Sequence, residues 1–294
     1  LENTYVSALP NDLNPDTQRI HTVYNQAVAA TGRLSSNNPN LQNIPIRTRR
    51  GQEVRKAFIP RDNNHILMAA DYSQIELRII AALSKDPAMV KAFQNNEDIH
   101  AATAAKVFDV PLDEVSREQR INAKTVNFGI VYGVSAFGLS QQTNLNRSES
   151  KELIDTYYES YPQLKQYISD QVNFAREHGY VATVLGRRRY LKDINSQNAV
   201  VRGAAERNAV NAPIQGSAAD IIKLAMIQIH QKIKSENWKS KMILQVHDEL
   251  VFDVLKSEKE GFEKMVKTEM EKAFDIGLPL LVDMGFGANW LEAH

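Results

Sequence analysis

Two adjacent carboxylates, Asp248 and Glu249, follow His247 between two apolar runs rich in β-branched residues. This pattern predicts a tight antiparallel hairpin over residues 241–254, with the three polar residues at or near its tip. Like charges this close repel, so one carboxylate should keep its proton unless a cation lies beside the pair. The pair therefore indicates a site for a divalent metal ion, and the alternative is an acidic surface turn.

A third carboxylate, Asp71, ends a predicted buried strand that passes directly into a helix within residues 65–78. Asp71 could cap this helix, or it could share a metal site with Asp248. Mg²⁺ is usually held by one or two carboxylates, while waters and substrate phosphates complete its octahedron. Two aspartates from different strands meet that requirement.

A nucleotide-binding helix is predicted from Arg120, Lys124, Phe128 and Tyr132, which follow one another at steps of four residues. On a helix these residues share one slowly drifting stripe. Its cationic half suits phosphates and its aromatic half suits a stacked base, so the stripe matches the two ends of a nucleoside triphosphate. The alternative is an amphipathic helix with two solvated bases and two core aromatics.

Together these three segments resemble the motifs of the family A DNA polymerases. Residues 71–78 are similar to the family's first motif, residues 120–132 to its nucleotide-binding helix and residues 245–249 to its third motif. The motifs occur in the family's order, and the similarity extends over essentially the whole chain. The resemblance implies an α+β fold, a polymerase right-hand core with an antiparallel palm sheet and a mostly helical fingers insertion.

The resemblance also implies how the chain is divided. We expect palm over residues 1–76, with the end of the thumb connection, fingers over residues 77–204, and palm with the catalytic hairpin over residues 205–294. No proofreading, 5′-nuclease or full thumb domain is recognisable. The first residues contain neither an initiator Met nor the apolar core of a signal peptide, so we interpret the sequence as a fragment.

The implied function is DNA-templated addition of dNTPs to a primer 3′-hydroxyl by two-metal nucleotidyl transfer, in DNA replication and repair. The expected catalytic residues are Asp71, Asp248, Lys124 and Glu249. Two Mg²⁺ ions, with Mn²⁺ as the alternative, would be held by Asp71, Asp248 and the backbone carbonyl of Tyr72. Lys124 would also supply a proton to the leaving group.

The remaining candidates implied by the resemblance contact either the incoming nucleotide or the DNA. The expected dNTP ligands are Arg120, Lys124, Phe128, Tyr132, His100, Gln74, Glu76 and Arg47. The expected DNA contacts are Arg33, Arg207, Asn211, Gln215 and His247. Glu76 is the residue expected to exclude a ribose 2′-hydroxyl and so to favour deoxynucleotides.

Several of these candidates have ordinary structural alternatives. Glu76 could be a solvated carboxylate on an exposed helix face, His100 a surface or capping residue, and Arg33 part of a polar surface loop. Basic neighbours could take the place of Arg47. The DNA-contacting stripe on the helix near Asn211 could instead serve core or capping roles.

Sequence patterns predict the elements that must carry these residues. Residues 18–31 suit one or two strands, and residues 179–190 suit a small hairpin with a basic arm. The helix that starts near Arg202 should be interrupted at Pro213. The chain should close with a helix and a strand, over residues 257–274 and 278–286.

Composition is typical of a soluble globular protein, with 43% hydrophobic and 24% charged residues and a net charge of zero. The absence of cysteine excludes disulfides, thiolate nucleophiles and Cys-ligated zinc. No apolar run approaches the roughly 20 residues needed to span a membrane. We expect primer–template DNA and dNTPs as partners, a monomer, and a cytoplasmic, nucleoid-associated location in a bacterium.

Three functional interpretations remain open from the sequence. The first is a DNA polymerase core of palm and fingers. The second is a single-subunit RNA polymerase, against which Glu76 and the neighbouring Tyr72, Ser73 and Gln74 count. The third is a non-catalytic nucleic-acid-binding module, because the chain begins where the family's thumb ends.

Overall fold

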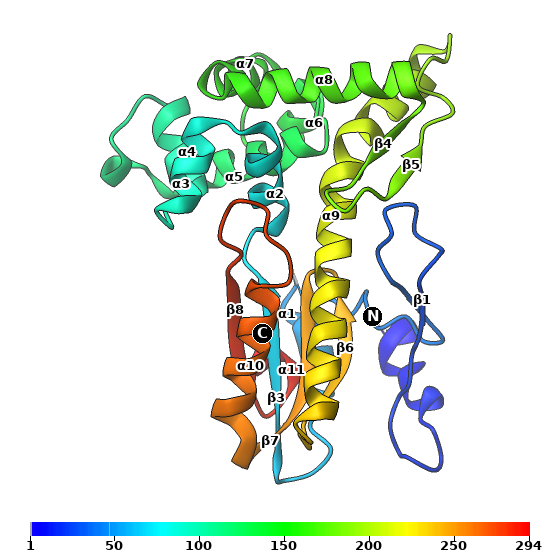
Figure 1. Cartoon of the computed structure of the whole chain (residues 1–294). Helices are drawn as coiled ribbons and strands as arrows, with labels where there is room; N and C mark the ends of the chain where they lie inside the picture. The colour runs from blue at the N-terminus through cyan, green and yellow to red at the C-terminus, as the bar shows by residue number, and fades with distance from the viewer. Residues whose placement is uncertain (1, 47) are drawn as a thin grey trace. The chain divides into compact units, whose positions relative to one another are not determined.

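The computed structural model describes residues 2–46 and 48–294, which divide into two compact units (Figure 1). The first unit consists of Leu1–Ser73, Ala219–Phe274 and Leu280–His294. The second consists of Gln74–Ala218 and Asp275–Pro279. Helices and antiparallel sheets occur together, which confirms the predicted α+β class. None of the described helices has the length and apolar composition that a membrane crossing requires.

The first unit is built on a four-stranded antiparallel sheet in the order β6-β7-β3-β8. Its strands are β3 (His65–Tyr72), β6 (Lys241–Val246), β7 (Glu249–Leu255) and β8 (Val282–Gly287). The predicted hairpin is confirmed, because β6 and β7 pair and only His247 and Asp248 separate them. The left-handed φ of 55° at His247 makes this short turn.

Alternating residues of this sheet face two different sets of side chains. On one face, Phe252 contacts Phe262 of α10 (Lys259–Glu271), with ring centroids 5.5 Å apart. On the other face, Ala69 and Val251 belong to a buried cluster with Trp290 of α11 (Trp290–Ala293). Figure 1 shows α10 lying along the sheet. The α11 face matters most here, because Asp71 lies two residues beyond Ala69 on the same side.

From Ala219 on, α9 (Ala199–Ser235) belongs to the first unit and leads towards β6. The remaining elements of this unit precede β3 or follow β7. They are the π-helical turn η1 (Glu2–Val6), the 3-10 turns η2 (Leu9–Asp12) and η4 (Lys256–Glu258), strands β1 (Val23–Asn25) and β2 (Ser35–Asn37), and helix α1 (Arg49–Arg55). Of the segment predicted as one or two strands, only β1 is a strand. The predicted last strand begins later than expected, at Val282, and the predicted last helix is shortened to α10.

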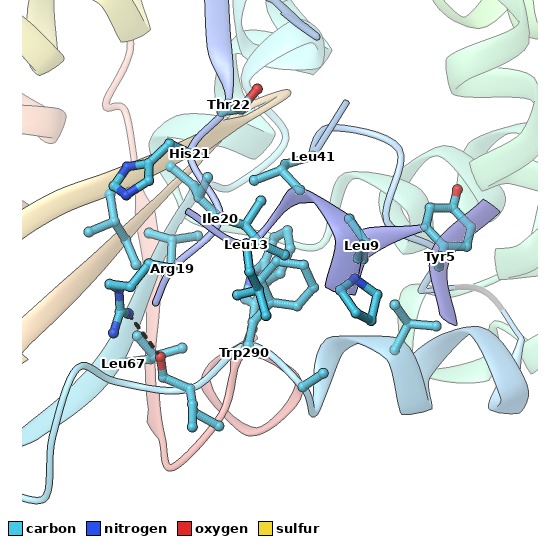
Figure 2. Close-up of a pocket in the computed structure, with 18 of the residues that line it drawn as sticks. Tyr5, Leu9, Leu13, Arg19, Ile20, His21, Thr22, Leu41, Leu67 and Trp290 are labelled. Carbon is cyan, nitrogen blue, oxygen red and sulfur yellow. Dashed lines mark hydrogen bonds between the residues drawn. The ribbon is translucent and has the colours of Figure 1, made fainter. Parts of the chain in front are cut away.

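A largely apolar cavity of about 1490 Å³ lies in the first unit (Figure 2). It is lined by residues of η1, η2, α1 and β6, and by Trp290. Leu9, Leu41 and Leu67 form part of its wall, and Arg19 donates to the Ile59 carbonyl at 3.3 Å beside it. None of the candidate metal-binding carboxylates lines this cavity.

The second unit is mostly helical, as predicted. Its elements are α2 (Ile75–Ser84), α3 (Pro87–Gln94), α4 (Ile99–Val107), η3 (Leu112–Glu114), α5 (Arg117–Val131), α6 (Ala136–Ser140), α7 (Arg147–Ser160), α8 (Pro162–His178), β4 (Tyr180–Ala182), β5 (Arg188–Tyr190) and the first part of α9 (Ala199–Ser235). Local signals set several helix starts. Ser116 and Gln119 form a capping box at α5, and the β4–β5 hairpin confirms the prediction for that segment.

The predicted interruption at Pro213 is wrong, since α9 continues through it. A proline inside a helix removes one backbone hydrogen bond and normally costs about 3 kcal/mol. Here both neighbours of Pro213, Ala212 and Ile214, are buried, so tertiary packing outweighs the local cost. The hydroxyl of Ser217 donates to the Pro213 carbonyl at 2.5 Å and accepts the N–H of Val184 at 2.9 Å.

Candidate active site

Three carboxylates lie in one row across the sheet of the first unit. Asp71 of β3 is directly opposite Glu249 of β7 and Asp283 of β8. Residues directly opposite in antiparallel strands point to the same face, so the three side chains share the α11 side. Asp248, in the turn before β7, accepts the N–H of Tyr72 with its backbone carbonyl at 3.2 Å.

Asp71 does not cap the following helix, so that alternative is wrong. The N-cap of α2 is Gln74, three residues further on, and no side chain makes a capping hydrogen bond there. The structure instead places Asp71 within the acidic row, next to Asp248 and Glu249. The three carboxylates predicted from two separate segments are therefore neighbours.

Electrostatics in this row favour a cation or a proton at Asp71. The pKa of Asp71 is raised to about 7, first by burial and then by the charges of Glu249, Asp248 and Asp283, whereas His294 opposes the shift. Near neutral pH the Asp71 carboxyl therefore binds a proton readily in the absence of a metal. A divalent cation would remove the same repulsion without protonation.

Glu249 has a different environment, since both of its oxygens accept hydrogen bonds. The indole Nε1 of Trp290 donates to Oε1 at 2.7 Å, and Nδ1 of His294 donates to Oε2 at 2.5 Å. The hydrogen bond to Glu249 raises the pKa of His294. Neither partner was predicted, although Trp290 and His294 are four residues apart and so fall on one helical face.

The donor set fits a hard divalent cation. Among the described residues no cluster of three or more His, Cys, Asp or Glu side chains has the geometry to hold a metal ion. Two aspartates with a backbone carbonyl form the partial oxygen shell that Mg²⁺ takes when water and phosphate complete it. Asp71, Asp248 and the carbonyl of Tyr72 can supply this shell, and Mn²⁺ accepts the same ligand types.

The segment around the loop that carries Arg33 is hydrogen-bonded to the β6–β7 hairpin. The hydroxyl of Tyr24 in β1 accepts the N–H of Gln245 at 2.9 Å and donates to its carbonyl at 2.8 Å. The side chain of Gln42 donates to Gln245 Oε1 at 2.9 Å. His247 is exposed at the turn, whereas the candidate Arg47 lies outside the described residues.

In the second unit, the cationic half of the predicted stripe is solvent-accessible. Arg120 and Lys124 are both exposed on α5. Nε of Arg120 donates to Asp98 Oδ2 at 2.6 Å, in a pair in which both side chains are 40% exposed or more. Such an exposed pair contributes little to stability, so Asp98 does not hold Arg120 firmly in place.

The aromatic half of the stripe meets a buried carboxylate. The hydroxyl of Tyr132 donates to Glu76 Oε2 at 2.6 Å, and Glu76 is only 5% exposed. The alternative of a solvated Glu76 is therefore wrong. Beside it, Gln74 has a left-handed backbone, and its Oε1 is buried without a hydrogen-bond partner in the described part of the chain.

His100 is buried rather than a surface residue. Asn127 Nδ2 donates to its Nδ1 at 3.0 Å, and its ring centroid lies 5.7 Å from that of Phe128. Burial lowers the pKa of His100 to about 4, with smaller contributions from Lys124 and Arg120, although Asp98 opposes the shift. The imidazole is neutral at pH 7, and because Nδ1 accepts a hydrogen bond its proton is on Nε2.

The other candidate DNA contacts of this unit follow one stripe of α9. Arg207, Asn211 and Gln215 fall at steps of four along a helix that Pro213 does not interrupt. Arg207 is exposed, and Gln215 is half-buried. The side-chain oxygen of Asn211 is buried and, like that of Gln74, finds no partner among the described residues.

Comparisons with known proteins agree with this geometry. The model of DNA polymerase family A matches residues 1–292. DNA polymerase I of Caldicellulosiruptor bescii is 51% identical over 289 residues, covering 98% of this chain and 34% of the relative. DNA polymerase I of Bacillus subtilis is 49% identical over 293 residues, covering 100% of this chain and 33% of the relative.

A solved structure has the same fold. It is described as the POL domain of Pol1 from M. smegmatis in complex with DNA primer-template and dNTP. Its TM-score is 0.93 at 48% identity, covering 98% of this chain and 51% of that chain. The chain spans about a third of the length of the curated relatives it matches. A match over essentially its whole length shows that the chain belongs to DNA polymerase family A.

Proposed function

We propose that this chain carries the nucleotidyl-transfer centre of a DNA-directed DNA polymerase, which adds dNTPs to a primer 3′-hydroxyl. The observation that carries the proposal is the convergence of Asp71, Asp248 and Glu249 at one end of β3 and β7, the two central strands of one sheet. The M. smegmatis relative, described with primer-template DNA and dNTP, supports the substrate class. In this proposal the first unit is palm and the second is fingers.

The chemistry of the first unit depends on oxygen ligands. Asp71, Asp248 and the Tyr72 carbonyl would hold two Mg²⁺ ions. Bound there, the ions would acidify the primer hydroxyl and neutralise charge on the leaving pyrophosphate. Asp71 would give up its proton on metal binding, since burial and neighbouring carboxylates hold its pKa near 7. Glu249 would stay beside the metal ligands, because protein donors occupy both of its oxygens.

The second unit would bind the nucleotide. Arg120 and Lys124 would contact the triphosphate, where negative charge increases as the bond breaks. Lys124 would also protonate the leaving pyrophosphate. The neutral His100 would donate Nε2–H to a phosphate oxygen, because burial keeps the ring uncharged. Phe128 would stack against the new base pair.

Glu76 and Tyr132 would discriminate against ribonucleotides. The carboxylate is buried and fixed by the Tyr132 hydroxyl, so it forms a rigid wall where a sugar would lie. A ribose 2′-hydroxyl would meet this wall, whereas a deoxyribose would not. This feature favours the DNA polymerase interpretation over an RNA polymerase.

The DNA would be recognised largely without regard to sequence. The side-chain amides of Gln74 and Asn211 carry N–H donors for minor-groove acceptors, and their oxygens, which have no partner among the described residues, can accept from a base amino group. Minor-groove acceptors are nearly the same for every base pair, which suits an enzyme that copies any template. Arg33, Arg207, Gln215 and His247 would complete these contacts, together with Arg47 near the triphosphate. We further propose a monomer that acts in replication and repair in the bacterial cytoplasm, at the nucleoid.

Primer extension with Mg²⁺ and each dNTP supplied singly tests the proposal. The unmutated chain should add only the complementary deoxynucleotide. Asp248→Ala should lower the rate by about 100-fold or more, because the metal loses a ligand. Asp16→Ala, which removes a carboxylate from an exposed position, is the matched control and should keep the activity. Equal extension by the unmutated chain and Asp248→Ala would contradict the metal assignment, and no extension by the unmutated chain would contradict the polymerase proposal.

A further inference from the structure

The carboxylate of Glu249 is held by a single small element, α11 with the residue that follows it. Glu249 is 4% exposed. Trp290 opens α11 and donates to Oε1, while His294 follows α11 and donates to Oε2. A glutamate has three rotatable side-chain bonds, so two donors on different oxygens restrict it far more than one would.

The sheet is shaped to let α11 approach closely. On β8, the residues that face α11 after Asp283 are Gly285 and Gly287. A Cβ added at Gly285 would collide with the carbonyl oxygen of Ala293, and one at Gly287 would collide with Glu292. Only glycine at both positions permits this approach without a shift of α11.

The start of α11 is fixed by its own hydrogen bonds. The backbone N–H of Trp290 donates to the Phe58 carbonyl at 2.9 Å. Asn289 caps the helix by accepting the N–H of Glu292 at 3.1 Å, and Glu292 accepts the N–H of Ala288 at 2.9 Å. The indole of Trp290 is therefore anchored through the backbone as well as through its ring.

Arg55 completes the surroundings of the indole. It is 4% exposed, and its guanidinium carbon lies 4.2 Å from the centroid of the Trp290 ring. Its Nη2 donates to the Ile44 carbonyl at 3.4 Å, whereas its Nε and Nη1 are buried without partners in the described chain. A cation over the ring face makes the indole N–H a stronger donor, because it withdraws electron density from the ring.

We infer that α11 and His294 form a clamp that fixes Glu249 in one rotamer beside Asp71, and that Trp290 and His294 are positioning residues for nucleotidyl transfer. This inference rests on the proposed function. Without the clamp, the Glu249 side chain could turn towards Asp71, which lies directly opposite it on the neighbouring strand. In that position it could compete with Asp71 for the metal ion, or its negative charge could repel that of Asp248. The partners of groups beside a metal typically affect activity by about 10- to 100-fold.

Steady-state kinetics of single-nucleotide addition test the clamp. Trp290→Phe removes the indole N–H but keeps an aromatic ring against Phe58 and Arg55. We expect kcat to fall by about 10- to 100-fold while KM for the dNTP changes by less than about threefold, since the dNTP ligands are untouched. Trp238→Phe removes the chain's other indole N–H, which donates to the surface residue Glu236, and should leave both constants unchanged.

His294 provides a second test that does not disturb the core, because its side chain is 37% exposed. His294→Ala should lower kcat in the same way as Trp290→Phe. His294→Asn should restore much of it, since the amide N–H can occupy the place of Nδ1–H. Unchanged kcat in both His294→Ala and Trp290→Phe, with the unmutated chain active, would overturn the positioning role.

The hydrogen bonds can be followed without activity. The chain has two tryptophans, so its ¹⁵N spectrum contains two indole N–H resonances, which Trp238→Phe assigns. Glu249→Gln and His294→Ala should each shift the Trp290 resonance and speed its hydrogen exchange, leaving Trp238 unchanged. If neither substitution changes the position or the hydrogen exchange of the Trp290 resonance, the clamp is refuted. This test is independent of the proposed function, because it does not require the unmutated chain to extend a primer.

Discussion

Asp71→Asn should stabilise the metal-free protein at alkaline pH. Asp71 lies between Glu249 and Asp283 in the acidic row, and burial followed by the charges of Glu249 and Asp248 raises its pKa from 3.8 to about 7. Since the folded state binds this proton more tightly than the unfolded state, the protonated group stabilises the fold. That stabilisation is complete below about pH 3.8 and is lost as the pH rises through about 7.

The size of the effect follows from the same two values. Each pH unit in this window removes about 1.4 kcal/mol, so the full range from 3.8 to about 7 corresponds to on the order of 4 kcal/mol. This is an upper limit, because Asp71 is partly exposed and solvent screens its charge. At a few degrees per kcal/mol, the unfolding midpoint of Asp71→Asn should exceed that of the unmutated chain by up to about 10 °C at pH 8.

Thermal unfolding at pH 5, 6, 7 and 8, with EDTA or with Mg²⁺, measures the effect. In EDTA the difference between Asp71→Asn and the unmutated chain should grow with pH and level off above about pH 7. Mg²⁺ should stabilise the unmutated chain at pH 8 and have little effect on Asp71→Asn, because the variant lacks the charge that binds the cation. Asp16→Asn, an exposed control, should show neither effect. A difference that is independent of pH would refute the electrostatic account of the row.

Two further substitutions test the role of Glu76 in nucleotide selection and the close approach of α11 to the sheet. Glu76→Ala should increase the use of ribonucleotides relative to deoxynucleotides by at least about tenfold, because it removes the buried carboxylate held by Tyr132. Competition assays with rNTP and dNTP measure this ratio, and an unchanged ratio would show that Glu76 does not exclude ribonucleotides. Gly285→Ala should destabilise the fold by about 1–3 kcal/mol, because its Cβ would collide with Ala293 and displace α11. Urea unfolding should show this loss of stability. The control Gly203→Ala, within α9 where an added Cβ has ordinary contacts, should leave the stability unchanged or increase it.

The elements that local signals define could be predicted from the sequence. The β6–β7 hairpin follows from two apolar runs around three polar residues, and the start of α5 follows from the capping pattern at Ser116. The stripe from Arg120 to Tyr132 follows from helical spacing alone. Each of these elements depends on residues that are close together in the sequence, so it can be predicted without knowing any distant contact.

Features that depend on distant contacts could not be predicted in this way. Asp283 joins the acidic row only because β8 pairs with β3, a register that neither strand encodes alone. The buried carboxylate of Glu76 accepts a hydrogen bond from the hydroxyl of Tyr132, which follows α5 and is 56 residues away in the sequence. The intrinsic cost of a proline predicts an interruption of the helix at Pro213, yet the packing of α9 outweighs that cost.

The three carboxylates of the acidic row differ in how their charge is tolerated. Glu249 accepts hydrogen bonds from Trp290 and His294, and Asp283 is exposed to water. Among the described residues, Asp71 has no such pair of donors and is less exposed than Asp283, and only the charge of His294 opposes the effects of burial and of the neighbouring carboxylates. A cation that binds beside Asp71 therefore relieves more repulsion than one that binds at any other position in the row. For this reason the arrangement of the sheet, rather than the number of acidic residues, determines where a metal ion would bind.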